Sequence, residues 1–343
     1  MSAATPVKAP VELTNHRGVM STLRKLAASQ EFVLLVSLIA LIVTVGTINA
    51  NYVRPNNLIS ILQGNAFAAV AAIGMSMVII SGNIDISVGS VVGVLAVISG
   101  NVAISGEPTF GSLIIPIAWA TPIILGALIG AAIGFLVAYL RIPSIVVTLG
   151  LASILKGGLI LVTSGREISG LPEGYELSQL RWLEIPSPIY FMIILTIIVA
   201  IWMRYSSFGR SIYAVGGNAE AARLSGINDR RVVLNVFILN GIFVGIAALL
   251  FATQLDIIRA TVPANFELLV ITASVVGGVS ILGGVGTVVG STLAAILLNA
   301  ISSSLVFVQI SPYWMRAFQG ILILLTVLAD LWRRRRQQIG LRG

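Results

Sequence analysis

The 343-residue chain contains no cysteine and a single histidine, His16. Without thiols it can form no disulfide, no thiolate zinc site and no iron–sulfur cluster. Because one histidine in a polar N-terminal arm leaves few candidates for general acid–base chemistry, an enzyme is the least favoured interpretation. The sequence also lacks a GxxxxGK(S/T) phosphate loop, so the chain does not bind ATP by that device.

Charged residues are scarce too, at 10% of the chain against about 25% in soluble domains. Hydrophobic residues make up 57%, and the mean hydropathy of +1.00 indicates a chain that resides in a lipid bilayer. The net charge of +8 does not indicate nucleic-acid binding. Many of the basic residues lie in the N-terminal arm and the C-terminal tail, and no basic face interleaved with aromatic residues is present.

Ten apolar runs follow one another, each with about the 17–25 residues that a helix needs to cross a hydrocarbon core. They cover about 32–48, 58–80, 86–104, 113–139, 143–163, 187–203, 232–253, 267–282, 286–307 and 313–331. The sequence therefore predicts an all-α, polytopic membrane protein with about ten transmembrane helices, in which the run 113–139 could form one span or more. A polar arm, 1–30, precedes this membrane domain, 31–332, and a basic tail, 333–343, follows it.

The charges of two loops predict the orientation. The loop 204–231 has five arginines and two acidic residues, a net +3, whereas the loop 164–186 has two arginines and four glutamates, a net −2. Because basic loops stay in the cytoplasm, we expect 204–231 inside and 164–186 outside. An even number of spans then places both termini in the cytoplasm, in agreement with the basic arm and tail.

A short helix is predicted within the loop 204–231. Residues 219–224 are good helix formers, Asn218 is a suitable N-cap, and Gly226 is a suitable residue just beyond the C-terminus. The helix should have about two turns. Displayed between two membrane spans, it suits docking into a groove of a soluble partner.

Two distant segments of the chain have similar sequences. The segment 82–90 aligns without gaps on 283–291, and the two share four residues. Since transporters are often built from duplicated halves with the site at glycine-interrupted helices, we expect two related halves with Gly-rich broken segments. The alternative is that glycine-rich turns in an apolar chain resemble one another by chance.

Asp85 stands in a stretch, 66–99, with no other charge. An ionised carboxylate in hydrocarbon costs on the order of 2.5–3.5 kcal/mol, so such groups usually face a cavity or a partner. One interpretation is that 81–87 breaks the helix and presents Asn83, Asp85 and Ser87 to a polar solute. The other, which we favour for Asp85, places a turn at the membrane surface, where Asn83 or Asp85 caps the next helix.

A path for a neutral, hydroxyl-rich solute needs amides, which both donate and accept hydrogen bonds. Singly, each amide inside a span is more often an interhelical hydrogen bond. The candidate residues of a translocation path or gate are Asn65, Ser81, Asn83, Asp85, Ser87 and Asn299. Ionisable groups inside the spans are few, which disfavours an ion-driven carrier and favours a separate ATPase as the source of work.

Three motifs occur in order along the chain. Residues 81–90 read SGNIDISVGS, residues 209–227 contain Glu220-Ala221-Ala222 followed by Gly226 at EAA-x-x-x-G spacing, and residues 268–291 contain GGVSILGGVGTVVGS. Together they resemble the GGID-L-S-V-G signature, the coupling loop and the second Gly-rich segment of ribose-type sugar permeases in binding-protein-dependent ABC importers. The resemblance spans about residues 50 to 330.

The resemblance implies a permease subunit in the bacterial inner membrane, with a monosaccharide or related small polyol as its solute. It implies as partners a second permease, a cytoplasmic ABC ATPase dimer or fused tandem ATPase that holds ATP and Mg²⁺, and a periplasmic sugar-binding protein, with no cofactor in this chain. The residues that it assigns to ATPase coupling are Gly209, Arg210, Gly216, Asn218, Glu220, Ala221, Ala222, Arg223, Ser225 and Gly226.

Two positions depart from the family pattern. Asn83 stands where the family usually has glycine, which resembles permeases of autoinducer-2 and rhamnose type and favours a paralogue over a second copy as the partner permease. The hydrophobic-Pro ending that follows the EAA loop in some importers is absent, since residues 236–240 read VFILN. The alternative function is an ion-coupled secondary carrier of a small polar solute.

Overall fold

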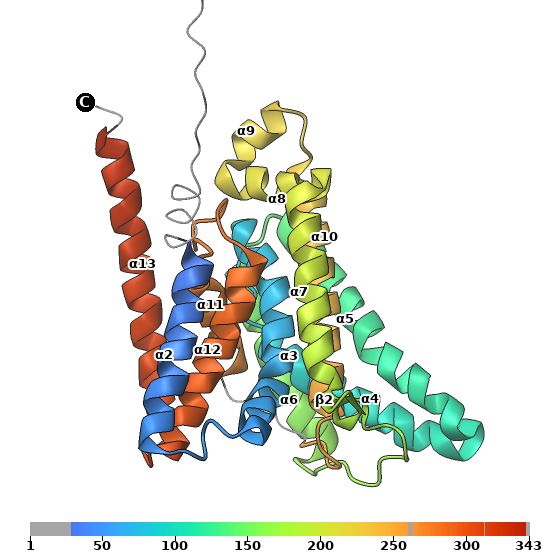
Figure 1. Ribbon diagram of the computed structural model, residues 1–343. Helices are drawn as coiled ribbons and strands as arrows, with labels where there is room; N and C mark the ends of the chain where they lie inside the picture. The colour runs from blue at the N-terminus through green and yellow to red at the C-terminus, as the bar shows by residue number, and fades with distance from the viewer. Residues whose placement is uncertain (1–28, 260–262, 264, 312, 341–343) are drawn as a thin grey trace, which may run out of the picture.

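The computed structural model describes residues 29–259, 263, 265–311 and 313–340, which are mostly helical (Figure 1). The long helices are α2 (Gln30–Ile48), α3 (Pro55–Ile80), α4 (Val88–Phe110), α5 (Ile114–Ala138), α6 (Ser144–Thr163), α7 (Ser187–Tyr205), α10 (Asp229–Ala252), α12 (Val288–Phe307) and α13 (Trp314–Gly340). The shorter elements are η1 (Gly111–Leu113), η2 (Leu177–Gln179), α8 (Ser207–Gly217), α9 (Ala219–Leu224), α11 (Phe266–Val276) and an antiparallel hairpin of β1 (Arg181–Trp182) and β2 (Ile185–Pro186).

Each of the ten predicted apolar runs contains a helix. Within the described part of the chain, seven helical segments are long and apolar enough to cross a membrane. One of these, Val88–Ala138, has 51 residues and joins α4, η1 and α5. The helical, polytopic class is therefore confirmed, and the ambiguous run 113–139 forms one helix, α5, while the number of crossings stays a prediction. The predicted arm lies almost wholly outside the described residues, and residues 333–340 continue α13.

The run predicted at 267–282 is helical only as far as Val276. α11 has 11 residues and so extends about 16 Å, roughly half of a hydrocarbon core about 30 Å thick. It ends where Gly277 and Gly278 turn the chain, and Gly278 has φ +95°, a backbone conformation that residues with a Cβ rarely adopt. Two stretches without helix therefore interrupt the bundle, 81–87 between α3 and α4 and 277–287 between α11 and α12, and we call them the interrupted segments.

The ends of the bundle differ. α8 and α9 lie at the top in Figure 1, near the start of α2 and the end of α13, and we call this the α9 end. The loop 164–186 lies at the opposite end. The two described chain ends and the loop 204–231 thus share one side of the bundle, as an even number of crossings requires.

α3 is the central helix. Nearly all of its residues from Ala66 to Ile80 are buried, and it packs against α7, α8, α10, α11 and α12. A helix that is apolar on all sides is stable only when neighbours surround it. α3 therefore fixes where the chain can turn at Ser81, directly beneath α8.

Glycines set the distance between α5 and α10. Gly126 and Gly130 on α5 face Gly241 and Gly245 on α10, and a methyl group added at Gly130 would overlap the carbonyl oxygen of Phe237. Small residues let helix backbones approach closely in membranes, where packing rather than hydrophobicity joins helices. These glycines therefore hold α5 and α10 in direct backbone contact.

The variant Gly130→Ala should lower the stability of the chain by about 1–3 kcal/mol, because the added methyl forces α5 away from α10. Gly150→Ala on α6 is the matched control, since no atom lies within 4 Å of its added methyl. Thermal melting of the two purified variants in detergent makes the comparison. Equal melting temperatures would contradict the packing described here.

Candidate functional site

The helix predicted in the loop 204–231 is present as α9. The side-chain oxygen of Asn218 accepts hydrogen bonds from the backbone nitrogens of Glu220, at 3.0 Å, and Ala221, at 2.9 Å. At the other end Gly226 has φ +83°, its nitrogen donates to Arg223, and the nitrogen of Ile227 donates to the carbonyl of Ala222. This pattern satisfies the last carbonyls of the helix. Both ends of α9 are therefore fixed by local sequence.

α9 presents most of its surface to solvent. Ala222 is buried against the bundle, and Leu224 is 87% exposed. Exposed with it are the predicted coupling residues Glu220, Ala221, Arg223, Ser225 and Gly226. Leu224 was not among the predicted residues, although its place two positions after the buried Ala222 puts it on another face of the helix. α9 is thus a fixed helix with an outward apolar residue.

The remaining predicted coupling residues lie in α8, which holds α9 on the bundle. A methyl group added at Gly209 would overlap the carbonyl oxygen of Met203, so the glycine permits the tight turn from α7 into α8. Arg210 donates from Nη1 to the carbonyl of Tyr205 at 2.9 Å. Gly216 contacts both interrupted segments through its backbone. Gly209 and Gly216 thus position α8 and α9 through their backbones, whereas Arg210 is exposed.

The first interrupted segment is held by hydroxyl groups of α6. The backbone nitrogen of Ile84 donates to Ser144 Oγ at 3.2 Å, and that of Ile86 donates to Thr148 Oγ1 at 3.0 Å. Backbone groups that leave a helix and are shielded from water need such partners, because they lose the hydrogen bonds of the helix. Sequence reasoning missed both hydroxyls. Their spacing of four residues at the start of an apolar run was the available signal.

Asp85 is 3% exposed and lies within the bundle. Its Oδ1 accepts from the backbone nitrogen of Ser87 at 2.8 Å and from Ser87 Oγ at 2.6 Å, and its Oδ2 accepts from Asn240 Nδ2 at 2.7 Å. Asn240 is eleven residues into α10, about 16 Å along it from the α9 end. Asp85 therefore lies well inside the bundle and also organises the turn before α4.

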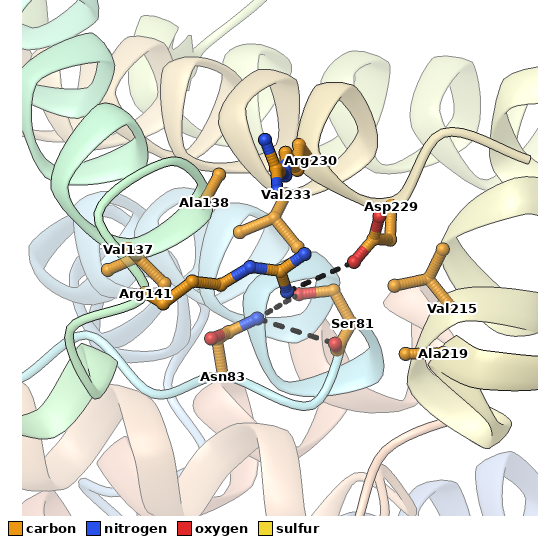
Figure 2. A pocket seen from close by; sticks show the side chains of 10 residues that line it. All are labelled: Ser81, Asn83, Val137, Ala138, Arg141, Val215, Ala219, Asp229, Arg230 and Val233. Atoms are coloured by element: carbon orange, nitrogen blue, oxygen red, sulfur yellow. Dashed lines mark hydrogen bonds and ion pairs between the residues drawn. The ribbon is translucent and has the colours of Figure 1, made fainter. Parts of the chain in front are cut away.

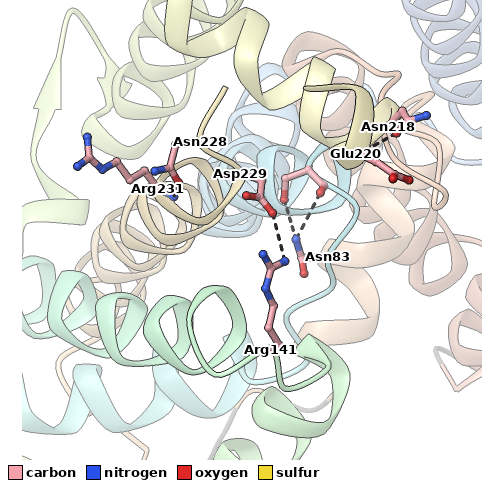
Figure 3. A network of polar contacts seen from close by, with 8 residues as sticks. Asn83, Arg141, Asn218, Glu220, Asn228, Asp229 and Arg231 are labelled. Carbon is pink, nitrogen blue, oxygen red and sulfur yellow. Dashed lines mark hydrogen bonds and ion pairs between the residues drawn. The ribbon is translucent and has the colours of Figure 1, made fainter. Parts of the chain in front are cut away.

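A cavity of about 170 Å³ opens beside the first interrupted segment (Figure 2). Ser81 and Asn83 line it, together with Ala219 of α9 and the ion pair of Arg141 and Asp229, whose Nη1 and Oδ2 atoms are 3.1 Å apart. Asn83 donates from Nδ2 to Ser81 Oγ at 3.1 Å. Figure 3 shows this polar group together with Asn218, the N-cap of α9, and Glu220. The cavity thus joins the interrupted segment to the predicted coupling helix.

The structure does not bring all predicted path residues together. Ser81 and Asn83 line the cavity, whereas Asp85 and Ser87 are buried behind it. Asn65 and Asn299 lie elsewhere on α3 and α12, and each donates to a carbonyl of its own helix. The sequence analysis did not single out Arg141. The available signal was its position as a lone arginine in the short turn between two apolar runs.

The outer loop 164–186 is packed onto the bundle. Tyr175 is buried, its hydroxyl is 2.8 Å from Ser99 Oγ, and burial raises the pKa of Tyr175 to about 12. Its phenol therefore stays protonated as a donor to Ser99, whose own proton goes to the carbonyl of Ala118. The hairpin of β1 and β2 projects from the loop, with Trp182 71% and Leu183 78% exposed. The loop is an ordered surface with an apolar tip.

Comparison with known proteins identifies the family. The family described as the branched-chain amino acid transport system permease component matches residues 57–327. The chain belongs to this permease family. The autoinducer 2 import system permease protein LsrC of Salmonella typhi is 34% identical over 303 residues, which cover 88% of this chain and 86% of LsrC. The ribose import permease protein RbsC of Escherichia coli strain K12 is 34% identical over 301 residues, which cover 86% of this chain and 92% of RbsC.

Family members are the permease components of ABC-type importers, which are non-catalytic subunits. The resemblance drawn from the three motifs is therefore confirmed. A multi-pass membrane location follows for the permease. No solved structure matches the permease significantly.

In the permease, Asn240→Ala should lower stability on the order of 3 kcal/mol, because it removes the amide that donates to the buried Asp85 carboxylate. Asn65→Ala is the matched control, since that half-buried amide donates to its own helix. Thermal melting of the purified variants measures the difference. If Asn240→Ala melts at the same temperature as Asn65→Ala, Asp85 does not depend on Asn240.

Proposed function

We propose that the permease translocates a monosaccharide or related small polyol across the bacterial inner membrane, driven by ATP hydrolysis on separate ATPase subunits. The observation that carries this proposal is the exposure of α9. This helix is capped at both ends and packs on the bundle through the buried Ala222, while Leu224 is 87% exposed. An apolar side chain on a fixed, outward helix fits a groove of a protein partner. Membership of the importer family supports a separate ATPase subunit as that partner. In our proposal it is a cytoplasmic ABC ATPase dimer or fused tandem ATPase that binds ATP and Mg²⁺.

The orientation follows from this docking. In our proposal the α9 end faces the cytoplasm, the helices make ten crossings, and both termini are cytoplasmic, in keeping with the net +3 of the loop 204–231. The loop 164–186 then faces the periplasm, where the hairpin offers Trp182 and Leu183 to a sugar-binding protein. A second permease, a paralogue rather than a copy of this chain, completes the pathway.

The solute class rests on the relatives and on the cavity. Two relatives are named for import of ribose and of autoinducer 2. Ser81 and Asn83 give the cavity a hydroxyl and an amide, groups that donate and accept hydrogen bonds and suit a neutral, hydroxyl-rich solute. Asp85 is held by Asn240 and Ser87 and so positions the segment without touching the solute. Weak contacts of this kind let a solute leave as the two permeases rock between states.

The variants Glu220→Arg, Leu224→Asp and Gly226→Pro should each abolish ATP-driven uptake while membrane insertion stays normal. The first two change the docking face, and proline cannot adopt the φ of +83° that ends α9. We expect uptake of radiolabelled ribose or rhamnose to fall at least about tenfold, the effect of losing one interfacial hot-spot contact.

A matched control separates docking from general damage to the surface. Leu183→Asp changes a leucine of similar exposure, 78% against 87%, at the opposite end of the bundle. Leu224→Asp should lose co-purification of the ATPase, and Leu183→Asp should retain it. Full co-purification and uptake by Leu224→Asp would overturn the assignment of α9.

Reconstitution separates the ATP-driven importer from an ion-coupled carrier. Proteoliposomes that contain the permease without any ATPase should not concentrate ribose or rhamnose under a proton or sodium gradient. The described residues support this expectation, since Asp85 is bonded to an amide and a hydroxyl and has no ionisable partner in a relay. Gradient-driven accumulation by the permease alone would contradict the proposed function.

A further inference from the structure

Five glycine backbones meet where α8 ends. The nitrogen of Gly284 donates to the carbonyl of Ile80 at 2.8 Å, which joins the second interrupted segment to the end of α3. A methyl group added at Gly216 would overlap that same carbonyl and lie 2.8 Å from the nitrogen of Gly284. A methyl added at Gly284 would lie 2.6 Å from Cα of Gly217. The end of α8 is thus wedged between the two interrupted segments.

The interrupted segments also touch each other. A methyl group added at Gly283 would lie 3.0 Å from Cα of Gly82 and 2.7 Å from the carbonyl oxygen of Gly216. Gly82 and Gly283 are the positions that the internal alignment pairs, and their φ angles are +84° and +81°. We call Gly82, Gly216, Gly283 and Gly284 the glycine junction.

α8 is attached to the second interrupted segment at one further point. Tyr213 donates from its hydroxyl to the carbonyl of Gly286 at 3.0 Å, and burial raises the pKa of Tyr213, which keeps the phenol protonated as a donor. Ile212 and Val215 on the same helix are buried in the bundle. α8 therefore cannot rotate or slide without moving residues 283–286.

The junction is close to α9 along the chain. Only Gly217 separates Gly216 from Asn218, the N-cap of α9. Side chains between two elements can absorb a displacement by changing rotamer, whereas backbones in direct contact cannot, because close-packed atoms transmit strain. A displacement of α9 must therefore reach Ile80 and Gly284 together.

We propose that the glycine junction is the mechanical connection through which α9 moves both interrupted segments, with Gly216 and Tyr213 as the positioning residues of the transport step. This inference rests on the proposed function, in which a partner ATPase displaces α9. It adds that one displacement acts on the two segments at the same time. The cavity lined by Asn83 and the turn at Gly286 then change in step.

The absence of cysteine from the chain allows a test that needs no knowledge of the solute. Asn83→Cys reports on the first interrupted segment and Val285→Cys on the second, each as the single thiol of the permease. The assembled complex with its ATPase is labelled with a maleimide dye, with and without ATP, and the labelling rate of the permease is measured. In the parent complexes ATP should change the rate at both reporters.

Gly216→Ala and Tyr213→Phe are then added to each reporter. The added methyl should remove the ATP response at both positions, and loss of the tyrosine hydroxyl should reduce it about fivefold, the effect of one hydrogen bond. The ATPase should still co-purify and hydrolyse ATP. Gly217→Ala is the matched control, because its added methyl would meet no atom nearer than 4.0 Å, and it should respond as the parent does.

Each outcome decides the inference. Full ATP responses in Gly216→Ala and Tyr213→Phe, or a lost response at only one reporter, would overturn it while leaving the proposed function intact. If Gly216→Ala fails to assemble, Tyr213→Phe decides alone, since it removes one hydroxyl and adds no atom. A parent complex without bound ATPase would instead refute the proposed function.

Discussion

Backbone groups that leave a helix and are shielded from water must find new hydrogen-bond partners, and both interrupted segments are built around that constraint. In the first segment, Ser144 and Thr148 of α6 accept from two backbone nitrogens, and Asp85 accepts from a third. In the second, the nitrogen of Gly284 donates to the carbonyl of Ile80, the last residue of α3. Neighbouring helices therefore supply the hydrogen bonds that hold each segment in place. For the second segment this neighbour is α3, the helix that directly precedes the first segment.

Close approach in turn explains where glycine occurs. Along α5 and α10 glycines let two straight helices touch over several turns, which joins them into one body. At the glycine junction they let three separate stretches of backbone meet at one place. The first arrangement makes a rigid unit, and the second makes a joint between units. In the transport step that we propose, rigid units rock about this joint, and its close-packed atoms transmit the motion because they cannot be compressed.

Local signals in the sequence predicted the long helices and α9 well. Hydropathy marks each apolar run, and Asn218 and Gly226 fix the ends of α9 without help from other elements. The end of α11 at Val276 was missed because residues 277–282 remain apolar enough to continue a span, and only the turn at Gly278 ends it. The bond between Asp85 and Asn240 and the ion pair of Arg141 with Asp229 join residues 155 and 88 positions apart, which no local pattern encodes.

Asp85 and Asn83 lie in the same short segment but have different roles in the proposal, in which Asn83 faces a neutral solute and Asp85 does not. Two positions apart, these side chains lie in different surroundings, the carboxylate buried between Ser87 and Asn240 and the amide at the wall of the cavity. The cavity already holds the carboxylate of Asp229, which is paired with Arg141. A second carboxylate there without such a partner would bind cations and hold water, and a solute would have to displace both. Turned inward, Asp85 bonds α10 to the start of α4 through Asn240 and Ser87. In the pathway that we propose, Asp85 therefore stabilises the segment from outside the cavity.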